Sequence, residues 1–507
     1  MSAHHRLTCL VMTGLLFAGT LNGQWLETTI YVPDSLSGLI GPQAFTYNAT
    51  NNKVYVGGEE GDCVIVIDGA TNQKIAKIPA GSDIQALVWN STNNKVYCAN
   101  WYSGNVTVID GATNSVITTI QVGGGPCALV YNPTDNKVYC ANYGSDDVTV
   151  IDGATNSVIT TIPVGDGPCA LAYNPTNNKV YCANGWSNDV TVIDGATNSV
   201  ITTITVGTYP CALVYNSTNN KVYCANRNDV TVIDGATNRV LTTIRVGYSP
   251  CALVYNPTNN KVYCANGNNV TVIDGATDSV ITTIPVVDGP RALVYNPTDN
   301  KVYCANLGSN DVTVIDGATD TVLTTIPVGL WPCALVYNPP NNKVYCANLG
   351  SNDVTVIDGA TNRVITTIPV GIGPCAFAYN PAQNRVYGAN YGSSSVSVIR
   401  DVVGIEEEAG FKKQPVRNEL TVTPNPCHSS TRIRYGLAKP GAVSLKVYNT
   451  AGQCVKTLVN TKQNPGIYEL NWQGTDNSNR KLSPGIYFLQ METADYRTTA
   501  RIVLLQE

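Results

Sequence analysis

The sequence predicts an all-β protein: a single β-propeller of four-stranded blades, followed by an immunoglobulin-like β-sandwich. The tetrapeptide Asp-Gly-Ala-Thr occurs eight times, at intervals of 42, 42, 42, 40, 40, 42 and 42 residues. An all-strand unit with a period of about 40–45 residues is typical of a propeller. Each repeat contains short runs rich in Val, Ile, Thr and Tyr, without helical periodicity. After Arg400 the repeats stop and a second strand-rich segment follows.

The repeat at 126–164 shows how the unit is built. Its predicted strands, A to D, span 127–132, 137–142, 147–152 and 157–164. Clusters of Asn, Asp, Gly, Pro and Ser separate them, which is the composition of tight turns. The Asp152-Gly153 pair predicts a hairpin turn in which the aspartate caps backbone amides. We therefore interpret the eight aspartates of this motif as structural residues, not as catalytic or metal-binding ones.

The number of recurring strands predicts nine blades. Strands B and C each recur nine times, whereas strand D follows only the first eight C strands. The segment 27–32 matches the pattern of strand D and is expected to complete the last blade, which would leave no open sheet edge. Usual propellers have four to eight blades, so eight blades with one displaced terminal repeat is the alternative.

The two ends of the chain differ from the repeats. Residues 1–23 predict a secretory signal peptide, because basic residues precede a short apolar stretch and small residues. The propeller is expected at 24–400, a charged linker at 401–417 and the C-terminal module at 418–507. No later segment is apolar enough to span a bilayer. We expect a mature protein that is secreted or attached to the cell surface.

Two resemblances agree with this division. The KVYCAN, VTVIDGATN and VITTIPVG motifs resemble the YVTN-type β-propeller repeats of bacterial and archaeal surface proteins, whose fold is shared by surface-layer proteins, lactonases and redox proteins. The segments from TVTPNPC to RIVLL, including 472–476, resemble the C-terminal sorting domain of type IX secretion cargo and the related Ig-like domain of hook-capping proteins. The second resemblance implies a partner in the secretion machinery and the outer surface of a Gram-negative-type bacterium.

Composition argues against several kinds of chemistry in the propeller. The chain has three histidines, none of them in 24–400, and no glutamate lies between 61 and 405. Histidine-dependent triads, His-ligated metals and haem are thereby excluded from the repeats. The net charge is −5 and no basic stripe exists, so nucleic acid is not an expected partner. We expect no enzymatic activity, no metal and no cofactor.

Thirteen of the seventeen cysteines recur at two positions of the repeat. Strand A begins with Cys127, Cys169, Cys211, Cys251, Cys333 and Cys375; strand B contains Cys98, Cys140, Cys182, Cys224, Cys264, Cys304 and Cys346. Pairing within blades would leave three of them unmatched. Pairing strand B with strand A of the next blade leaves only Cys264, which faces Arg291, and gives six pairs: 98–127, 140–169, 182–211, 224–251, 304–333 and 346–375.

We expect the disulfides between blades, because an exported protein permits them and each would close a loop of about 30 residues, stabilising the fold by about 3–4 kcal/mol. If the two cysteines of one repeat project from the same face of their sheet, pairing within blades remains open. The other alternative is that all are buried thiols that pack as small apolar residues.

Sequence variation concentrates on one end of the predicted ring. We call the B–C loops and D–A links the variable rim, and the A–B and C–D turns the constant rim, which reads NPTNN and DGATN almost throughout. The candidate ligand-binding residues are the aromatic ones on the variable rim: Trp101, Tyr143, Trp186, Tyr209, Tyr248 and Trp331. Loops on a rigid scaffold usually carry binding groups, and aromatic rings suit sugars or peptide side chains. The alternative is drift in loops that tolerate change.

These observations predict a non-enzymatic propeller that binds a glycan, peptide or matrix ligand through the variable rim and uses its C-terminal module for export or anchoring. Two alternatives remain at this stage. One is an extracellular enzyme of the lactonase or quinoprotein-like type, and the other is a structural component of a surface layer.

Overall fold

The computed structural model describes residues 23–32, 38–402, 419–423, 425–427, 430–437, 439, 441–463, 466–493 and 495–505. Nearly all of the predicted signal peptide and linker lies outside these residues. The chain divides into two compact units, Met1–Ile405 and Glu406–Glu507. Each unit is described by itself.

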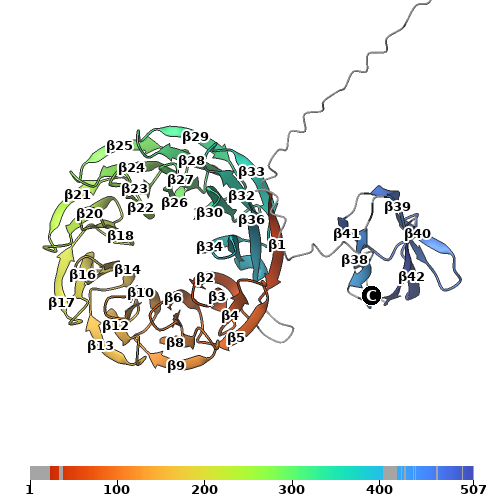
Figure 1. Ribbon diagram of the computed structural model, residues 1–507, viewed down its shortest axis with the longest axis horizontal. Helices are drawn as coiled ribbons and strands as arrows, with labels where there is room; N and C mark the ends of the chain where they lie inside the picture. The colour runs from red at the N-terminus through yellow and green to blue at the C-terminus, as the bar shows by residue number, and fades with distance from the viewer. Residues whose placement is uncertain are drawn as a thin grey trace, which may run out of the picture. The chain divides into compact units, whose positions relative to one another are not determined.

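The described residues of the first unit form nine four-stranded antiparallel sheets. Figure 1 shows them around a common centre, with the first strand of each repeat innermost and the fourth outermost. In the repeat at 126–164, the observed strands are β10 (Pro126–Asn132), β11 (Lys137–Asn142), β12 (Asp147–Asp152) and β13 (Val158–Pro163). They agree with predicted strands A to D to within one residue, so hydrophobic alternation and turn composition were sufficient to place them.

The other sheets repeat this pattern. Two sheets precede it: β2 (Ile40–Asn48), β3 (Lys53–Glu60), β4 (Cys63–Asp68) and β5 (Lys74–Pro79), then β6 (Ile84–Asn90), β7 (Lys95–Asn100), β8 (Asn105–Asp110) and β9 (Val116–Gln121). Three follow it: β14 (Pro168–Asn174), β15 (Lys179–Asn184), β16 (Asp189–Asp194) and β17 (Val200–Thr205); β18 (Ala212–Asn216), β19 (Lys221–Ala225), β20 (Asp229–Asp234) and β21 (Val240–Arg245); and β22 (Ala252–Asn256), β23 (Lys261–Asn266), β24 (Asn269–Asp274) and β25 (Val280–Pro285). The last two complete repeats form β26 (Pro290–Asn296), β27 (Lys301–Asn306), β28 (Asp311–Asp316) and β29 (Val322–Pro327), then β30 (Pro332–Asn338), β31 (Lys343–Asn348), β32 (Asp353–Asp358) and β33 (Val364–Pro369).

The ninth sheet joins the two ends of the repeat series. It contains β34 (Pro374–Asn380), β35 (Arg385–Asn390) and β36 (Ser395–Val402), with a short 3₁₀ turn at Tyr391–Ser393, and its fourth strand is β1 (Gly23–Tyr31). Strand β1 runs antiparallel to β36, pairing Trp25 with Arg400 and Tyr31 with Ser395. The prediction that an N-terminal strand completes the last repeat is confirmed.

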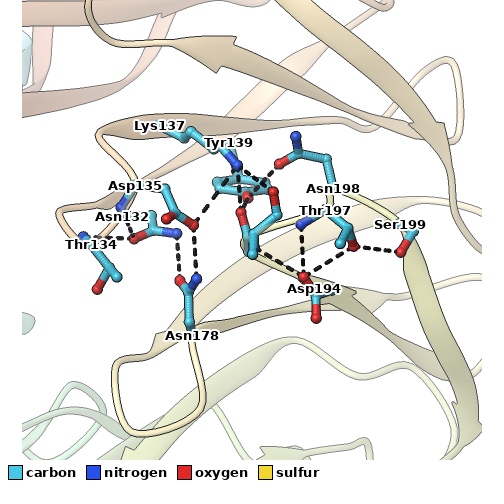
Figure 2. Close-up of polar contacts among 12 residues, drawn as sticks. Asn132, Thr134, Asp135, Lys137, Tyr139, Asn178, Asp194, Thr197, Asn198 and Ser199 are labelled. Carbon is cyan, nitrogen blue, oxygen red and sulfur yellow. Dashed lines mark hydrogen bonds and ion pairs between the residues drawn. The ribbon is translucent and has the colours of Figure 1, made fainter.

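Neighbouring sheets are linked by a polar contact on the constant rim (Figure 2). Lys137 Nζ on β11 donates to the carbonyl oxygens of Gly195, at 2.6 Å, and Ala196, at 3.0 Å, in the C–D turn of the following sheet. The hydroxyl of Tyr139 donates to Oδ1 of Asn198 in the same turn, at 3.0 Å. We call this arrangement the lysine–tyrosine clamp. The equivalent lysine reaches the next C–D turn at Lys53, Lys95, Lys179, Lys221, Lys261 and Lys301.

The clamp changes where the ninth sheet interrupts the pattern. The ninth sheet has no C–D turn of its own, and Lys343 instead forms an ion pair with Asp401 at 2.5 Å. Arg385 replaces the usual lysine and donates to the carbonyl oxygens of Gly69 and Ala70 in the first C–D turn. It also forms an ion pair with Glu27 on β1 at 2.6 Å. Lys343 thus joins the eighth sheet to the ninth, and Arg385 joins the ninth sheet to the first.

The apolar core lies between sheets. One cluster combines Tyr139, Val148 and Val150 of one sheet with Val180 and Cys182 of the next, all fully buried. Because strands B and C are buried on both faces, a single sheet in isolation would expose them. Each Å² of apolar surface buried between sheets contributes about 25 cal/mol to stability. The stability of the fold therefore depends mainly on the interfaces between sheets.

The second unit contains two packed sheets. One is formed by β37 (Glu419–Thr423), β38 (Thr431–Leu437) and β41 (Gly466–Trp472), and the other by β39 (Gly441–Tyr448), β40 (Cys454–Gln463), β42 (Gly485–Glu492) and β43 (Arg497–Leu504). Ile433 and Trp472 of the first sheet share a buried core with Leu445 and Leu489 of the second. This arrangement agrees with the predicted Ig-like sandwich.

The Glu27–Arg385 ion pair predicts an acid-sensitive contact. Burial raises the pKa of Glu27, but the hydrogen bonds and charge of Arg385 outweigh burial, so the pKa is lowered. The carboxylate therefore stabilises the fold above about pH 4.5, and this contribution is lost as the pH falls through the folded-state pKa. Glu27→Gln should lower the free energy of unfolding at pH 7 by about 1–2 kcal/mol and flatten its decline below about pH 4.5.

Urea unfolding at several pH values measures this effect. The matched control is Glu60→Gln, which removes an exposed carboxylate at the end of β3. If Glu27→Gln has the same pH profile of stability as the wild type, the ion pair does not stabilise this contact.

Candidate functional site

The constant rim is occupied by structural hydrogen bonds. Asp152 Oδ1 accepts from the amides of Ala154 and Thr155, both at 2.8 Å, and the Thr155 amide is the largest cause that lowers the pKa of Asp152. Nδ2 of Asn132 donates to Oδ1 of Asn178 in the next sheet at 2.8 Å. The structural role predicted for the repeated aspartate is therefore confirmed at this turn.

The variable rim carries a row of aromatic side chains in mutual contact. The ring centroids of Trp101 and Tyr143 are 5.5 Å apart, and those of Trp186 and Tyr209 are 6.0 Å apart in an edge-on arrangement. The indole Nε1 of Trp186 donates to the hydroxyl of Tyr143. We call these four residues the aromatic row. They come from three successive B–C loops and one D–A link, so the row crosses sheet boundaries.

Two members of the aromatic row are open to solvent, whereas Trp101 and Tyr143 are partly buried. Trp186 is 62% exposed and Tyr209 is 49% exposed. A monomeric protein buries large aromatic rings where it can, and a contiguous exposed group of them is typical of a binding surface.

Two aromatic residues of the variable rim hold a backbone conformation that favours glycine. Tyr209 and Trp331 have φ values of 56° and 57°, at link positions where five of the nine repeats have glycine: Gly41, Gly125, Gly167, Gly289 and Gly373. A bulky residue in the left-handed region costs about 1–2 kcal/mol. Such strain tends to be retained at functional sites.

A cavity of about 420 Å³ continues from the aromatic row. It is lined by Tyr209, Arg227, Tyr248, Arg291 and the thiols of Cys211 and Cys251, together with the link at 249–250. The guanidinium carbon of Arg227 lies 5.8 Å from the centre of the Tyr248 ring, a distance at which cation–π attraction acts. The cavity therefore combines two cations with two aromatic faces.

The structure brings five of the six predicted ligand-binding residues to this part of the rim. Tyr209 belongs to both the aromatic row and the cavity, and Tyr248 joins the cavity through Arg227. Trp331 is exposed on the link before β30, and no aromatic pair in the described part of the chain connects it to the row. Arg227 and Arg291 were not among the predicted site residues. The sequence did mark both as unusual: Arg227 lies in a shortened B–C loop, and Arg291 replaces the cysteine that begins strand A in six other repeats.

The twelve cysteines predicted to form disulfides are all thiols in the structure. The predicted direction of pairing was wrong. Cys140 packs with Tyr97 and Val106 of the preceding sheet, whereas Cys127 Sγ donates to the carbonyl oxygen of Pro168 in the following sheet, at 3.2 Å. Cys140 and Cys169, a predicted pair, therefore do not face each other, and the same opposition recurs through the series.

The physical reason is that strand-B cysteines face the preceding sheet and strand-A cysteines the following one, the reverse of what the predicted pairing requires. A β-bulge at the start of strand A sets the direction of the strand-A thiol. The register between β10 and β11 shifts between Pro126 and Ala128, so Cys127 has no partner opposite it. Without the bulge, Cys127 would share a face with Leu129, which lies opposite Cys140. The bulge turns the Cys127 thiol toward the next sheet. No residue pattern in the repeat predicted this bulge.

The thiols are predicted to be poorly reactive in the folded protein. Burial raises the pKa of Cys127 to about 12 and that of Cys169 to about 11. At pH 8 the thiolate fraction of Cys169 is then about a hundredfold smaller than in an unfolded chain. Iodoacetamide should label these thiols at least about a hundredfold more slowly in the native protein than in denaturant.

The intact mass of the protein after labelling in denaturant without reductant gives the number of free thiols. We expect all thirteen cysteines at the two repeat positions to be labelled. Failure of these cysteines to react until a reductant is added would show that the mature protein contains disulfides after all.

Within the described residues, no group of three or more His, Cys, Asp or Glu side chains is arranged to hold a metal ion. The same part of the chain contains no helix long and apolar enough to cross a membrane.

Comparison with known proteins supports the fold and the C-terminal domain. Residues 428–496 match the family model of the FlgD Ig-like domain. The computationally designed Ika8 protein is similar in structure to this chain, with a TM-score of 0.52 and 16% identity over 73% of this chain and 99% of that one. The dihydro-heme d1 dehydrogenase NirN, solved in complex with DHE, has a TM-score of 0.53 and 14% identity over 73% of this chain and 80% of that one. No curated protein matches the sequence significantly.

The fold and the comparisons define the class of protein. It is an all-β protein whose repeated four-stranded sheets have a propeller-like arrangement, followed by an Ig-like domain. The structural similarities lie below 25% identity and therefore establish fold alone.

Proposed function

We propose that this protein is a secreted or surface-displayed, non-enzymatic β-propeller of nine blades that binds an extracellular glycan, peptide or matrix component through its variable rim. The observation that carries the proposal is the aromatic row: rings from successive sheets contact one another on the variable rim, and two of them are exposed. On the opposite rim the polar side chains are engaged in contacts within and between sheets. A surface with exposed aromatic rings is suited to a ligand, and one whose polar groups are all used in internal contacts is less so.

We infer that the ring is closed through the ninth sheet. The pairing of β1 with β36 and the hydrogen bonds from Arg385 to the first C–D turn support closure. The repeat motifs support membership of the YVTN type. A closed ring of similar blades would hold the rim loops at fixed spacing, which lowers the entropy lost when several of them bind one ligand.

The C-terminal Ig-like domain is proposed to serve export or anchoring through the type IX secretion route. The resemblance of its segments to that sorting domain supports this role, and so does the signal peptide that the sequence predicts. Fractionation of cells that express the chain with and without residues 418–507 tests it. Equal amounts of both forms at the cell surface would argue against a sorting role.

Binding should depend on the aromatic row. A glycan and peptide array probed with the full chain identifies ligands. For each ligand, Trp186→Ala and Tyr209→Gly should each weaken binding about tenfold or more, because each removes a large stacking surface. Tyr209→Gly places at this link the residue that five other repeats hold there, so the fold is expected to be retained or slightly stabilised.

Trp25→Ala is the matched control. It removes another exposed tryptophan, which lies near the start of β1 and pairs with Arg400 of β36. If both rim variants bind every array ligand as the wild type does, or if the Trp25 variant loses binding equally, the variable rim is not the binding surface.

A further inference from the structure

The cavity lies where the repeats are shortest. The two 40-residue repeats each lose two residues from the B–C loop, and these loops are the segments between β19 and β20 and between β23 and β24. The lining residues come from this part of the rim: Arg227 lies in the first shortened loop, and Tyr209 and Tyr248 lie in the D–A links beside it. The cavity thus lies beside the first of the two shortened loops.

Two cations line this space without a carboxylate partner among the described residues. Neither the guanidinium of Arg227 nor that of Arg291 has a hydrogen bond or ion pair with any residue that the structure describes. Arg291 stands at the strand-A position that holds cysteine in six repeats. Its charge acts on Cys251 and Cys333 on either side, so it lies in the same row as these thiols. A pair of arginines free of carboxylates is typical of a site that receives an anion.

The remaining lining is neutral. No aspartate or glutamate is among the residues that line the cavity. Cys211 and Cys251 donate through Sγ to the carbonyl oxygens of Pro250, at 3.3 Å, and Pro290, at 3.0 Å. Burial raises the pKa of both thiols, so they are protonated at neutral pH and do not repel an anion.

We propose that this cavity binds the anionic group of an acidic sugar, a carboxylate or a sulfate, between Arg227 and Arg291. Tyr209 and Tyr248, 49% and 63% exposed, would pack their faces against the sugar ring. The proposal rests on the binding function proposed for the variable rim and names the class of ligand. The cavity volume of about 420 Å³ is within the range of small-molecule sites.

An acidic peptide is the less suitable ligand. Extended peptides commonly add a strand to an open sheet edge. The lining here consists of loops, links and the start of the innermost strand of one sheet, and offers side chains and not a free edge. A compact ring that carries one negative charge matches this set of groups.

The test uses the full chain and titration calorimetry with four probes. They are a galacturonic acid trisaccharide, a sulfated galactan oligosaccharide of the same length, the neutral galactose trisaccharide and a triglutamate peptide. We expect saturable binding of one or both acidic sugars, which weakens as salt is raised from about 0.05 to about 0.5 M. The two acidic probes distinguish carboxylate from sulfate.

Arg227→Gln and Arg291→Cys should each weaken this binding about tenfold or more, the loss expected for one charged hydrogen-bond donor. Arg291→Cys introduces the residue found in six other repeats and so keeps the local packing. The matched control, Arg239→Gln, removes an exposed arginine from the constant rim and should bind within about twofold of the wild type. Thermal unfolding of each variant verifies the fold.

Three outcomes would overturn the proposal: no saturable binding of either acidic sugar, equal binding of the neutral trisaccharide, or the same arginine-dependent affinity for triglutamate. The function of the rim as a whole is judged separately. If the array finds ligands whose binding needs Trp186 but not Arg227 or Arg291, the rim binds ligands and the assignment of an acidic sugar to this cavity is wrong.

Discussion

The lysine–tyrosine clamp is the contact on which the arrangement of sheets depends. In each clamp a buried or half-buried lysine on strand B donates hydrogen bonds to the carbonyl oxygens of a turn in the next sheet. The tyrosine two residues later donates a hydrogen bond to the same turn. Hydrogen bonds to a charged donor contribute about 1.5–3 kcal/mol each, and the clamp recurs around the series. Apolar burial between sheets is larger but has no direction. The clamp supplies the direction, because it connects each of the first seven sheets to a defined turn of the following sheet.

The clamp also explains why one rim is constant and the other varies. Its lysine, tyrosine and turn residues all lie at the ends of strands that meet the constant rim, so a change there breaks a contact between sheets. The loops of the variable rim differ in length and in side chains between repeats. The aromatic row, the left-handed Tyr209 and Trp331, and the cavity of the two short repeats all occur on this side. The scaffold is thus held at one rim and free to acquire binding groups at the other.

Local sequence patterns were sufficient for the strands and turns but not for what individual side chains face. The alternation in 126–164 located four strands, and the match of 27–32 to strand D located the partner of β36. The disulfide prediction failed because Cys140 faces the preceding sheet, whereas a bulge turns Cys127 toward the following one. The cavity was not predictable from spacing, since it arises where a D–A link, a shortened loop and the substitution at Arg291 meet in three sheets. Periodicity describes one repeat, whereas these features depend on differences between neighbours.

A double-mutant cycle across one clamp measures the central contact most directly. Tyr139→Phe removes the hydroxyl on β11, and Asn198→Gly removes its acceptor while accommodating the φ of 58° at that turn. The free energy of unfolding of the wild type, both single variants and the double variant gives the coupling between the two sheets. The clamp predicts a coupling of about 0.5–1.5 kcal/mol. Additive effects, with no coupling between Tyr139 and Asn198, would contradict a clamp that joins neighbouring sheets.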